Sequence, residues 1–303
     1  MNNSLKTGFT LVFYFGKVTL TFDVWHKFGR IKKNQRSDLR QVNGGPTSVN
    51  AFMPYRKEQF VNGEIYHIIV KGIDENVIFK DIDDHYRGIF SIYEFNNAKQ
   101  VEIRERRKTR ARLKKQIKKV AKEFQKIKAQ IDTGPTSVDS RDKLVEVLAF
   151  CLMPNHLHLL IRQIKDGGII KFMVKLGTGY GGYFNRKYAR QGHVFLRQFT
   201  AVHIKTDEQL KIVFVYIHTN PISLIEPKWK EIGIKNPEKV IKFLEDYKWS
   251  SYQDYIGKKN FPSVTDRNFI LKIMGGEEGC REFVESWIRY KGEIKEFPKL
   301  ALE

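Results

Sequence analysis

Two apolar runs separated by a tight turn constrain the fold of this chain more than any other feature. Residues 144–152 (LVEVLAFCL) and 157–162 (LHLLIR) have the length and composition of β-strands. Between them, Met153-Pro154-Asn155 has the chemistry of a turn. Strands joined by so short a connection pair antiparallel. The sequence therefore predicts a β-hairpin, and with it an antiparallel sheet.

The segments around this hairpin alternate between strand and helix patterns. Residues 65–71 predict a strand with Ile65, His67, Ile69 and Lys71 on one face, because side chains two apart in a strand share a face. Apolar residues at helical spacing follow at 81–95, 168–189 and 206–218. This order predicts the α+β class, an antiparallel sheet packed with helices.

Charge indicates the class of partner. The chain has 303 residues, with 54 Lys and Arg against 34 Asp and Glu, which gives a formal net charge of +20. Its 41% hydrophobic residues suffice for a core and exclude a wholly disordered basic tail. Such an excess favours a polyanion, nucleic acid first and an anionic membrane surface second.

Neither a disulfide framework nor a membrane span is predicted. Cys151 and Cys280 are the only cysteines and form no zinc pattern, so a reduced, cytoplasmic setting is expected. The longest apolar stretch, residues 9–25, contains Lys17 and Asp23 and alternates as strands do. We therefore predict that the chain does not insert into a membrane.

Much of the positive charge lies in one segment. Residues 99–130 contain 14 Lys and Arg and 3 Asp and Glu, so they supply +11 of the +20. Apolar residues at steps of three or four predict an amphipathic helix here. It could be a solvated helix packed along its apolar stripe, or a helix that contacts nucleic acid. The repeated pentapeptide GPTSV, at residues 45–49 and 134–138, predicts a loop on each side of it.

We therefore divide the chain into three parts. Residues 1–52 are an N-terminal extension of unknown role. Residues 53–255 form the main domain, interrupted by a basic helical insert at about 99–143. Residues 256–303 form a C-terminal helical addition of unknown role.

Two histidines follow the turn of the predicted hairpin. His156 and His158 are two residues apart, so in a strand their side chains project from the same face. Two imidazoles placed in this way can bind one divalent cation. A histidine pair of this kind also occurs in purely structural roles, and the motif alone does not separate the two cases.

A tyrosine and an amide lie further along the chain. At the end of the helical stretch that starts near residue 206, Tyr216 and Asn220 are four residues apart, which in a helix places them one turn apart on one face. The Tyr216 hydroxyl could attack a phosphate if the Asn220 amide reached the same cation. The alternative for Tyr216 is a core aromatic residue whose hydroxyl is satisfied at the rim.

Other residues compete for these roles. Tyr183 is our second choice as nucleophile, because it lies in a glycine-rich segment that could line DNA. His67 and His218 could approach the site, although single histidines are usually structural. Four basic residues are candidate phosphate contacts, although they could also be merely solvated: Arg186, Lys187, Arg190 and Arg197.

Taken together, these segments resemble the single-tyrosine HUH transposases, most closely the group of REP-associated tyrosine transposases. The resemblance runs from about residue 53 to residue 255, apart from the basic insert. It is carried by short blocks in a fixed order: GEIYHI at 63–68, MPNHLHLLI at 153–161, YFNRKY at 183–188 with GHVF at 192–195, YIHTNP at 216–221, and YKWSSY at 247–252.

The resemblance implies a ferredoxin-like (RRM-like) fold with the histidine pair on a central strand. It implies that His156 and His158 are metal ligands and that Tyr216 is the nucleophile. Asn220 stands where related enzymes often carry a glutamine as a third ligand. The cofactor implied is Mg²⁺ or Mn²⁺, although imidazole would also accept Zn²⁺. The family also implies a homodimer, in which the tyrosine of one subunit can serve the metal site of the other.

The function predicted from the sequence is therefore enzymatic. We predict a metal-dependent DNA transposase that cleaves and rejoins single-stranded or hairpin DNA through a 5′-phosphotyrosine. The alternatives are a nucleic-acid-binding protein that does not cleave, such as a domesticated relative, and an HUH-type nicking nuclease that does not rejoin strands.

Overall fold

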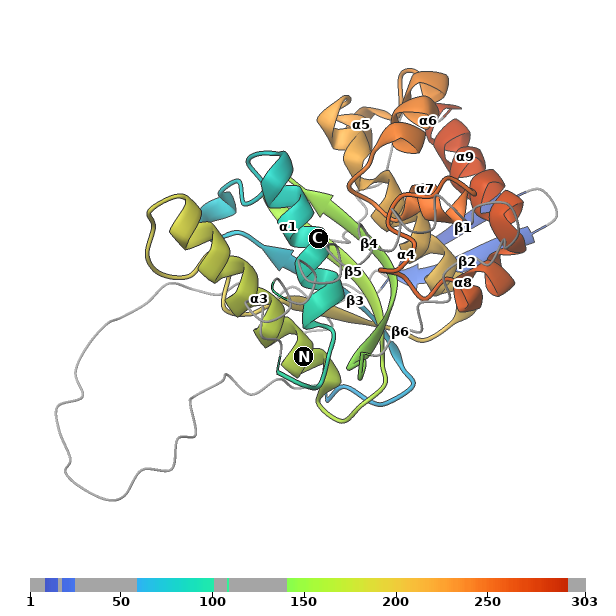
Figure 1. Ribbon diagram of the computed structural model, residues 1–303. Coiled ribbons are helices and arrows are strands. Elements are labelled where there is room, and N and C mark those ends of the chain that lie inside the picture. Colours follow the sequence, from blue (N-terminus) through green and yellow to red (C-terminus); the bar gives the residue numbers. More distant parts are fainter. Residues whose placement is uncertain (1–8, 16–17, 25–58, 101–107, 109–140, 294–303) are drawn as a thin grey trace, which may run out of the picture. The chain divides into compact units, whose positions relative to one another are not determined.

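The computed structural model describes residues 9–15, 18–24, 59–100, 108 and 141–293 (Figure 1). Two compact units are formed by Met1–Gln59 and Phe60–Glu303. In the first unit, strands β1 (Phe9–Phe15) and β2 (Val18–Val24) pair antiparallel, in the stretch where strand-like alternation was expected. Most of the predicted basic insert and both GPTSV repeats lie outside the described residues.

A four-stranded antiparallel sheet forms the centre of the second unit. Its strand order is β4-β5-β3-β6, and its strands are β3 (Ile65–Lys71), β4 (Val145–Met153), β5 (His156–Gln163) and β6 (Thr200–Ile204). With helices α1 (Ile82–Phe95) and α3 (Gly168–Lys187), the chain order is β-α-β-β-α-β. The α+β class and the antiparallel sheet predicted from the sequence are confirmed.

The hairpin predicted from the sequence is the pair β4 and β5, joined by a turn at Pro154 and Asn155. This turn packs against the end of β3, where the backbone N–H of Gly72 donates to the carbonyl of Asn155 at 2.8 Å. A Cβ at Gly72 would lie 2.5 Å from the carbonyl oxygen of Asn76 and 3.2 Å from that of Asn155. Only glycine allows this close approach, which fixes the start of β5 beside β3.

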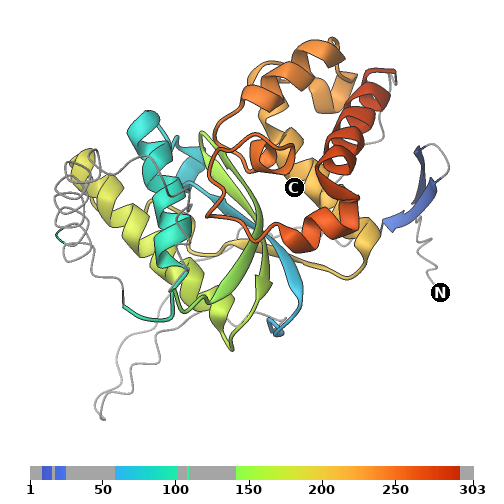
Figure 2. The same ribbon diagram turned by 45° about the vertical axis from the view of Figure 1, so that its right-hand side comes forward.

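Helices cover both faces of the sheet, which explains why β4 is apolar at every position except Glu146 (Figures 1 and 2). On one face, α1 and α3 pack against β4 residues such as Val147, Phe150 and Leu152. Asp81 caps the start of α1, since its side chain accepts a hydrogen bond from the backbone N–H of Asp84.

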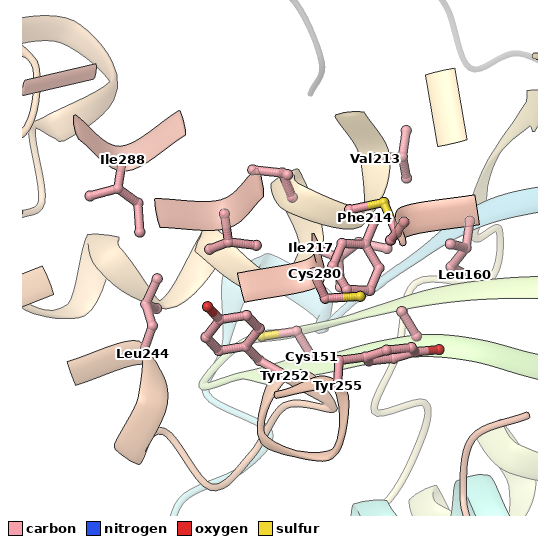
Figure 3. Packing of buried hydrophobic residues seen from close by; sticks show 14 of the residues in the cluster. Cys151, Leu160, Val213, Phe214, Ile217, Leu244, Tyr252, Tyr255, Cys280 and Ile288 are labelled. Carbon is pink, nitrogen blue, oxygen red and sulfur yellow. The ribbon is translucent and has the colours of Figure 1, made fainter. Parts of the chain in front are cut away.

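The opposite face is covered by α4 (Asp207–Thr219) and by helices that follow it in the chain. Figure 3 shows Phe214 and Ile217 of α4 in the same buried cluster as Cys151 of β4 and Cys280. The later elements are η2 (Asn220–Leu224), α5 (Trp229–Ile232), α6 (Pro237–Asp246), α7 (Tyr252–Tyr255), α8 (Asn268–Met274) and α9 (Gly276–Glu293). The helical segment predicted after residue 255 thus contributes α9 to this core.

The block GHVF at 192–195, which resembles the strand that follows the helix of the YFNRKY block in the transposases, forms no strand here. The strand β6 begins at Thr200 instead, and Phe195 forms only an isolated bridge with Gly72. Gly192 has a φ of 87°, a conformation that favours glycine, so the chain turns here before β6. Among the described helices, none is both long enough and apolar enough to cross a membrane.

Candidate active site

The histidine pair lies on β5, on the face of the sheet that α4 covers. Strand alternation places His156, His158 and Leu160 on one face, and Leu160 belongs to the cluster that packs against α4. His158 is buried, with 2% of its surface exposed, and His156 at the strand start is half-buried. Their ring centroids are 4.8 Å apart, so the two imidazoles are neighbours as the sequence predicted.

A third imidazole comes from the neighbouring strand. In the antiparallel register Ile69 lies opposite His158, and His67 lies opposite Leu160. His67 is therefore on the same face and diagonal to His158. Nε2 of His67 is 3.0 Å from Nδ1 of His158, and the two rings are stacked. The sequence placed His67 on the correct face of its strand but could not predict this contact.

Tyr216 approaches the histidines from α4. Its ring centroid is 5.6 Å from that of His158 and 5.7 Å from that of His67, in edge-to-face geometry. The helix that carries it begins at Thr206, whose side chain accepts a hydrogen bond from the backbone N–H of Gln209. One chain thus brings the predicted nucleophile next to His158 of the histidine pair.

Asn220 is buried one turn after Tyr216. Its Nδ2 donates to the backbone carbonyl of Tyr216 at 3.1 Å, so the amide group is held against the end of α4. Asn220 thus lies next to the tyrosine in the fold, as predicted, and its side chain contacts the backbone of Tyr216.

Positive charge surrounds the imidazoles. Burial lowers the pKa of His158 well below its usual range, and the nearby His67, His156, Lys230 and Lys71 lower it further. Burial also lowers the pKa of His67 to about 4. Both rings are therefore neutral at pH 7, which is the form of histidine that binds a metal ion.

The sequence did not predict a role for Lys230, which lies in the four-residue helix α5. Its ammonium group is 5.6 Å from the centre of the Tyr216 ring.

The donor groups fit a cation held by two imidazoles. Nε2 of His158 is buried without a hydrogen-bond partner in the described structure. Nδ1 of His156 lies 2.6 Å from Oδ1 of Asn155, and histidines that bind metals commonly donate their second ring N–H in this way. Among the residues described, no group of three or more His, Cys, Asp or Glu could hold a metal ion. An amide, water or phosphate oxygen would therefore have to complete the coordination.

Tyr183, the second-choice nucleophile, belongs to a different environment. It lies on α3, which covers the other face of the sheet, and its hydroxyl donates to Oδ1 of Asp84 at 3.0 Å. Asp84 is fully buried and also accepts from Lys187 at 2.8 Å and from Tyr188 at 2.7 Å. Burial raises the pKa of Tyr183, and the neighbouring Asp84 carboxylate raises it further. The structure thus separates Tyr183 from the histidines.

The Asp84 network also predicts a large effect on stability. Burial opposes ionisation of Asp84, but hydrogen bonds from Lys187 and Tyr188 hold its pKa below the usual range. Asp84→Ala should lower the free energy of unfolding by about 2–4 kcal/mol in urea at pH 7, because it leaves the Tyr183 hydroxyl and the backbone N–H of Lys80 without their acceptor. Lys187 and Tyr188 would keep Asp81 as an acceptor. This contribution is present at neutral pH and is lost as the pH falls below the usual aspartate range. The exposed Asp83→Ala in the same turn should cost less than about 1 kcal/mol. Equal losses in the two variants would contradict the assignment.

The remaining predicted residues are more dispersed. Arg186 and Arg197 are exposed, Arg190 lies over the ring of Phe184 at 5.6 Å, and Lys187 forms ion pairs with both Asp81 and Asp84. His218 is fully buried and pairs with Ser251 at 2.8 Å, which gives it a structural role.

A known protein family matches the part of the sequence that contains the histidine pair and Tyr216. Residues 104–220 match the model of the family described as "Transposase IS200 like". Over these residues the chain is similar to the IS200-like transposases. The matched segment includes His156, His158, Tyr216 and Asn220, and it supports a DNA-processing enzyme of the transposase type. It is shorter than the resemblance expected at 53–255, and it includes most of the predicted insert.

Comparisons with individual proteins add little to the family match. No curated protein matches this transposase-like chain. Among solved structures, it is similar to a REP-associated tyrosine transposase bound to a REP hairpin, with 11% identity and a TM-score of 0.39. That similarity covers 71% of this chain and 96% of the other.

Proposed function

We propose that this chain is a metal-dependent, single-tyrosine DNA transposase that cleaves and rejoins single-stranded or hairpin DNA. The observation that carries the proposal is the approach of Tyr216 to His158 and His67 on one chain, with ring centroids 5.6 and 5.7 Å apart. A phenol beside neutral, buried imidazoles suits nucleophilic attack on a phosphodiester. The net charge of +20 suits a DNA substrate.

The proposed reaction transfers a phosphoryl group to Tyr216. Its phenolic oxygen forms a bond to the scissile phosphorus, and the bond from phosphorus to the 3′ oxygen breaks. The products are a 5′-phosphotyrosine and a free 3′-hydroxyl, which takes up the equivalent of the phenol's proton. Because one phosphate ester replaces another, a 3′-hydroxyl of a second strand can reverse the step and rejoin DNA.

His156 and His158 would hold the divalent cation, Mg²⁺ or Mn²⁺. When bound, such an ion polarises the scissile phosphate and stabilises the charge that develops during attack. Asn220 remains the proposed third protein ligand, since it lies beside Tyr216 in the fold. To donate its amide oxygen, it would have to do so while Nδ2 keeps its bond to the Tyr216 carbonyl.

Two lysines are positioned to neutralise the phosphate. Lys71 ends β3 opposite His156 in the register, and the ammonium group of Lys230 lies 5.6 Å from the Tyr216 ring centre. Both charges act on His158. Fixed cations beside a reacting phosphate stabilise the transition state without the cost of reorganising water.

Two finer assignments follow from the same geometry. The β-α-β-β-α-β order with strands arranged β4-β5-β3-β6 supports placing the second unit among ferredoxin-like folds. The contact of Tyr216 with the histidines of its own chain supports a site completed within one subunit. If the protein forms the predicted homodimer, the second subunit would then not be needed to supply the tyrosine.

Covalent capture of DNA tests the proposed function. The protein is incubated with labelled single-stranded hairpin DNA in Mn²⁺ or in EDTA, and then denatured. We expect a denaturation-resistant adduct in Mn²⁺ and none in EDTA, because removal of the cation leaves the phosphate unpolarised. Tight binding without an adduct for any hairpin would favour a binding protein, and an adduct without strand joining would favour a nicking nuclease.

A further inference from the structure

A hydrogen bond between two buried histidines has a role in the proposed site. His67 and His158 come from neighbouring strands, and Nε2 of His67 is 3.0 Å from Nδ1 of His158. They are 5% and 2% exposed, so water cannot replace either partner easily. A polar group buried in this way is costly unless it is hydrogen-bonded. The pair must therefore share one proton in a defined direction.

The two possible directions have different consequences. If His67 donates, His158 carries its own hydrogen on Nε2, and a buried N–H is left with no acceptor in the described structure. If His158 donates from Nδ1, its Nε2 keeps a lone pair. Only the second arrangement lets His158 bind a cation, because a ligand nitrogen must be deprotonated.

We propose that His67 is a positioning residue that accepts the Nδ1–H of His158 and so holds His158 in the tautomer whose Nε2 can bind the cation. The inference rests on the proposed function, which makes His158 a metal ligand. It adds a residue outside the segment that matches the transposase family, residues 104–220. His67 takes the place that a carboxylate or a backbone carbonyl occupies beside many histidines that bind metals.

The surroundings of His67 favour this role over simple packing. Its neighbours on the same face of β3 are Ile65 and Ile69, and Leu160 lies opposite in the register. An aliphatic residue would fill this position at lower cost than a buried imidazole. The rings of His67 and Tyr216 are also in edge-to-face geometry, so His67 helps to fix where the tyrosine lies relative to His158.

The test measures the tautomer of His158 and the affinity for Mn²⁺, so activity is not its only readout. His67→Leu removes the acceptor, and His67→Gln retains one in its amide oxygen. His203→Gln is the matched control, because His203 is a half-buried histidine on β6, where it pairs with Glu64 at 2.8 Å. Circular dichroism establishes that each variant is folded.

We expect ¹⁵N NMR of histidine-labelled protein to show His158 as the Nδ1–H tautomer, with its signal assigned by His158→Gln. His67→Leu should lose this tautomer and bind Mn²⁺ about 10- to 100-fold more weakly, as is typical when the partner of a metal-ligating histidine is removed. His67→Gln should recover most of the affinity, and His203→Gln should match the wild type.

An Nε2–H His158 in the wild-type protein would overturn the inference, whether or not Mn²⁺ binds. Unchanged Mn²⁺ affinity and an unchanged His158 tautomer in folded His67→Leu would also overturn it. Absence of Mn²⁺ binding to the wild type would contradict the proposed metal site instead, and the tautomer of His158 would still decide the role of His67.

Discussion

Tyr216→Phe should reduce formation of the covalent DNA adduct by at least about 10³-fold, the scale of loss seen when a catalytic nucleophile is removed. Phenylalanine keeps the ring that packs edge-on against His67 and His158. The change therefore deletes the attacking oxygen and leaves the packing in place. The rate of adduct formation with labelled hairpin DNA in Mn²⁺ measures the effect, and binding of uncleaved DNA should change little.

Tyr183→Phe is the matched control. It also deletes one tyrosine hydroxyl, but the Tyr183 hydroxyl donates to Asp84 of α1, on the other face of the sheet from the histidines. The variant should form adduct at close to the wild-type rate and lose about 1 kcal/mol of stability. Loss of the adduct in Tyr183→Phe, with Tyr216→Phe still active, would exchange the two assignments.

Mixing two inactive variants should not restore activity. Tyr216→Phe lacks the nucleophile, and His156→Ala lacks a proposed metal ligand. Because Tyr216 packs against the histidines of its own chain, every site in a mixed assembly would contain one of the two defects. The adduct yield of the mixture should equal that of the two variants measured separately.

Co-expression with two different affinity tags makes this test decisive. Protein retained on both tags contains mixed assemblies, and assemblies of wild type with Tyr216→Phe serve as the positive control. Recovery of adduct in mixed assemblies of Tyr216→Phe and His156→Ala would show that the tyrosine of one subunit serves the histidines of another. That result would contradict the arrangement proposed here.

Local sequence signals predicted the strands and helices well. The turn at residues 153–155 produced the β4–β5 hairpin, and two-residue alternation put His156 and His158 on one face. The same alternation in β3 placed His67 on the face that now carries the site. These predictions succeeded because each depends on residues within one or two neighbouring strands.

The sequence could not determine which helix covers which face of the sheet. Tyr183 and Tyr216 both lie on helices with an apolar side, yet α3 and α4 pack on opposite faces. Their separation follows from tertiary packing of β4, which is apolar on both sides and so accepts helices on either. Lys230 gave no signal for the same reason, since only the path of η2 and α5 brings it over Tyr216.

The most direct test of the central claim is to identify the tyrosine that carries DNA. After nuclease trimming and trypsin digestion of the adduct, Tyr216 falls in the peptide of residues 212–228, where it is the only tyrosine. Tyr180 and Tyr183 fall together in the peptide of residues 176–186. We predict that mass spectrometry will find a nucleotide joined to Tyr216 through its 5′ phosphate. The same modification on the peptide of residues 176–186, with residues 212–228 unmodified, would contradict the site proposed here.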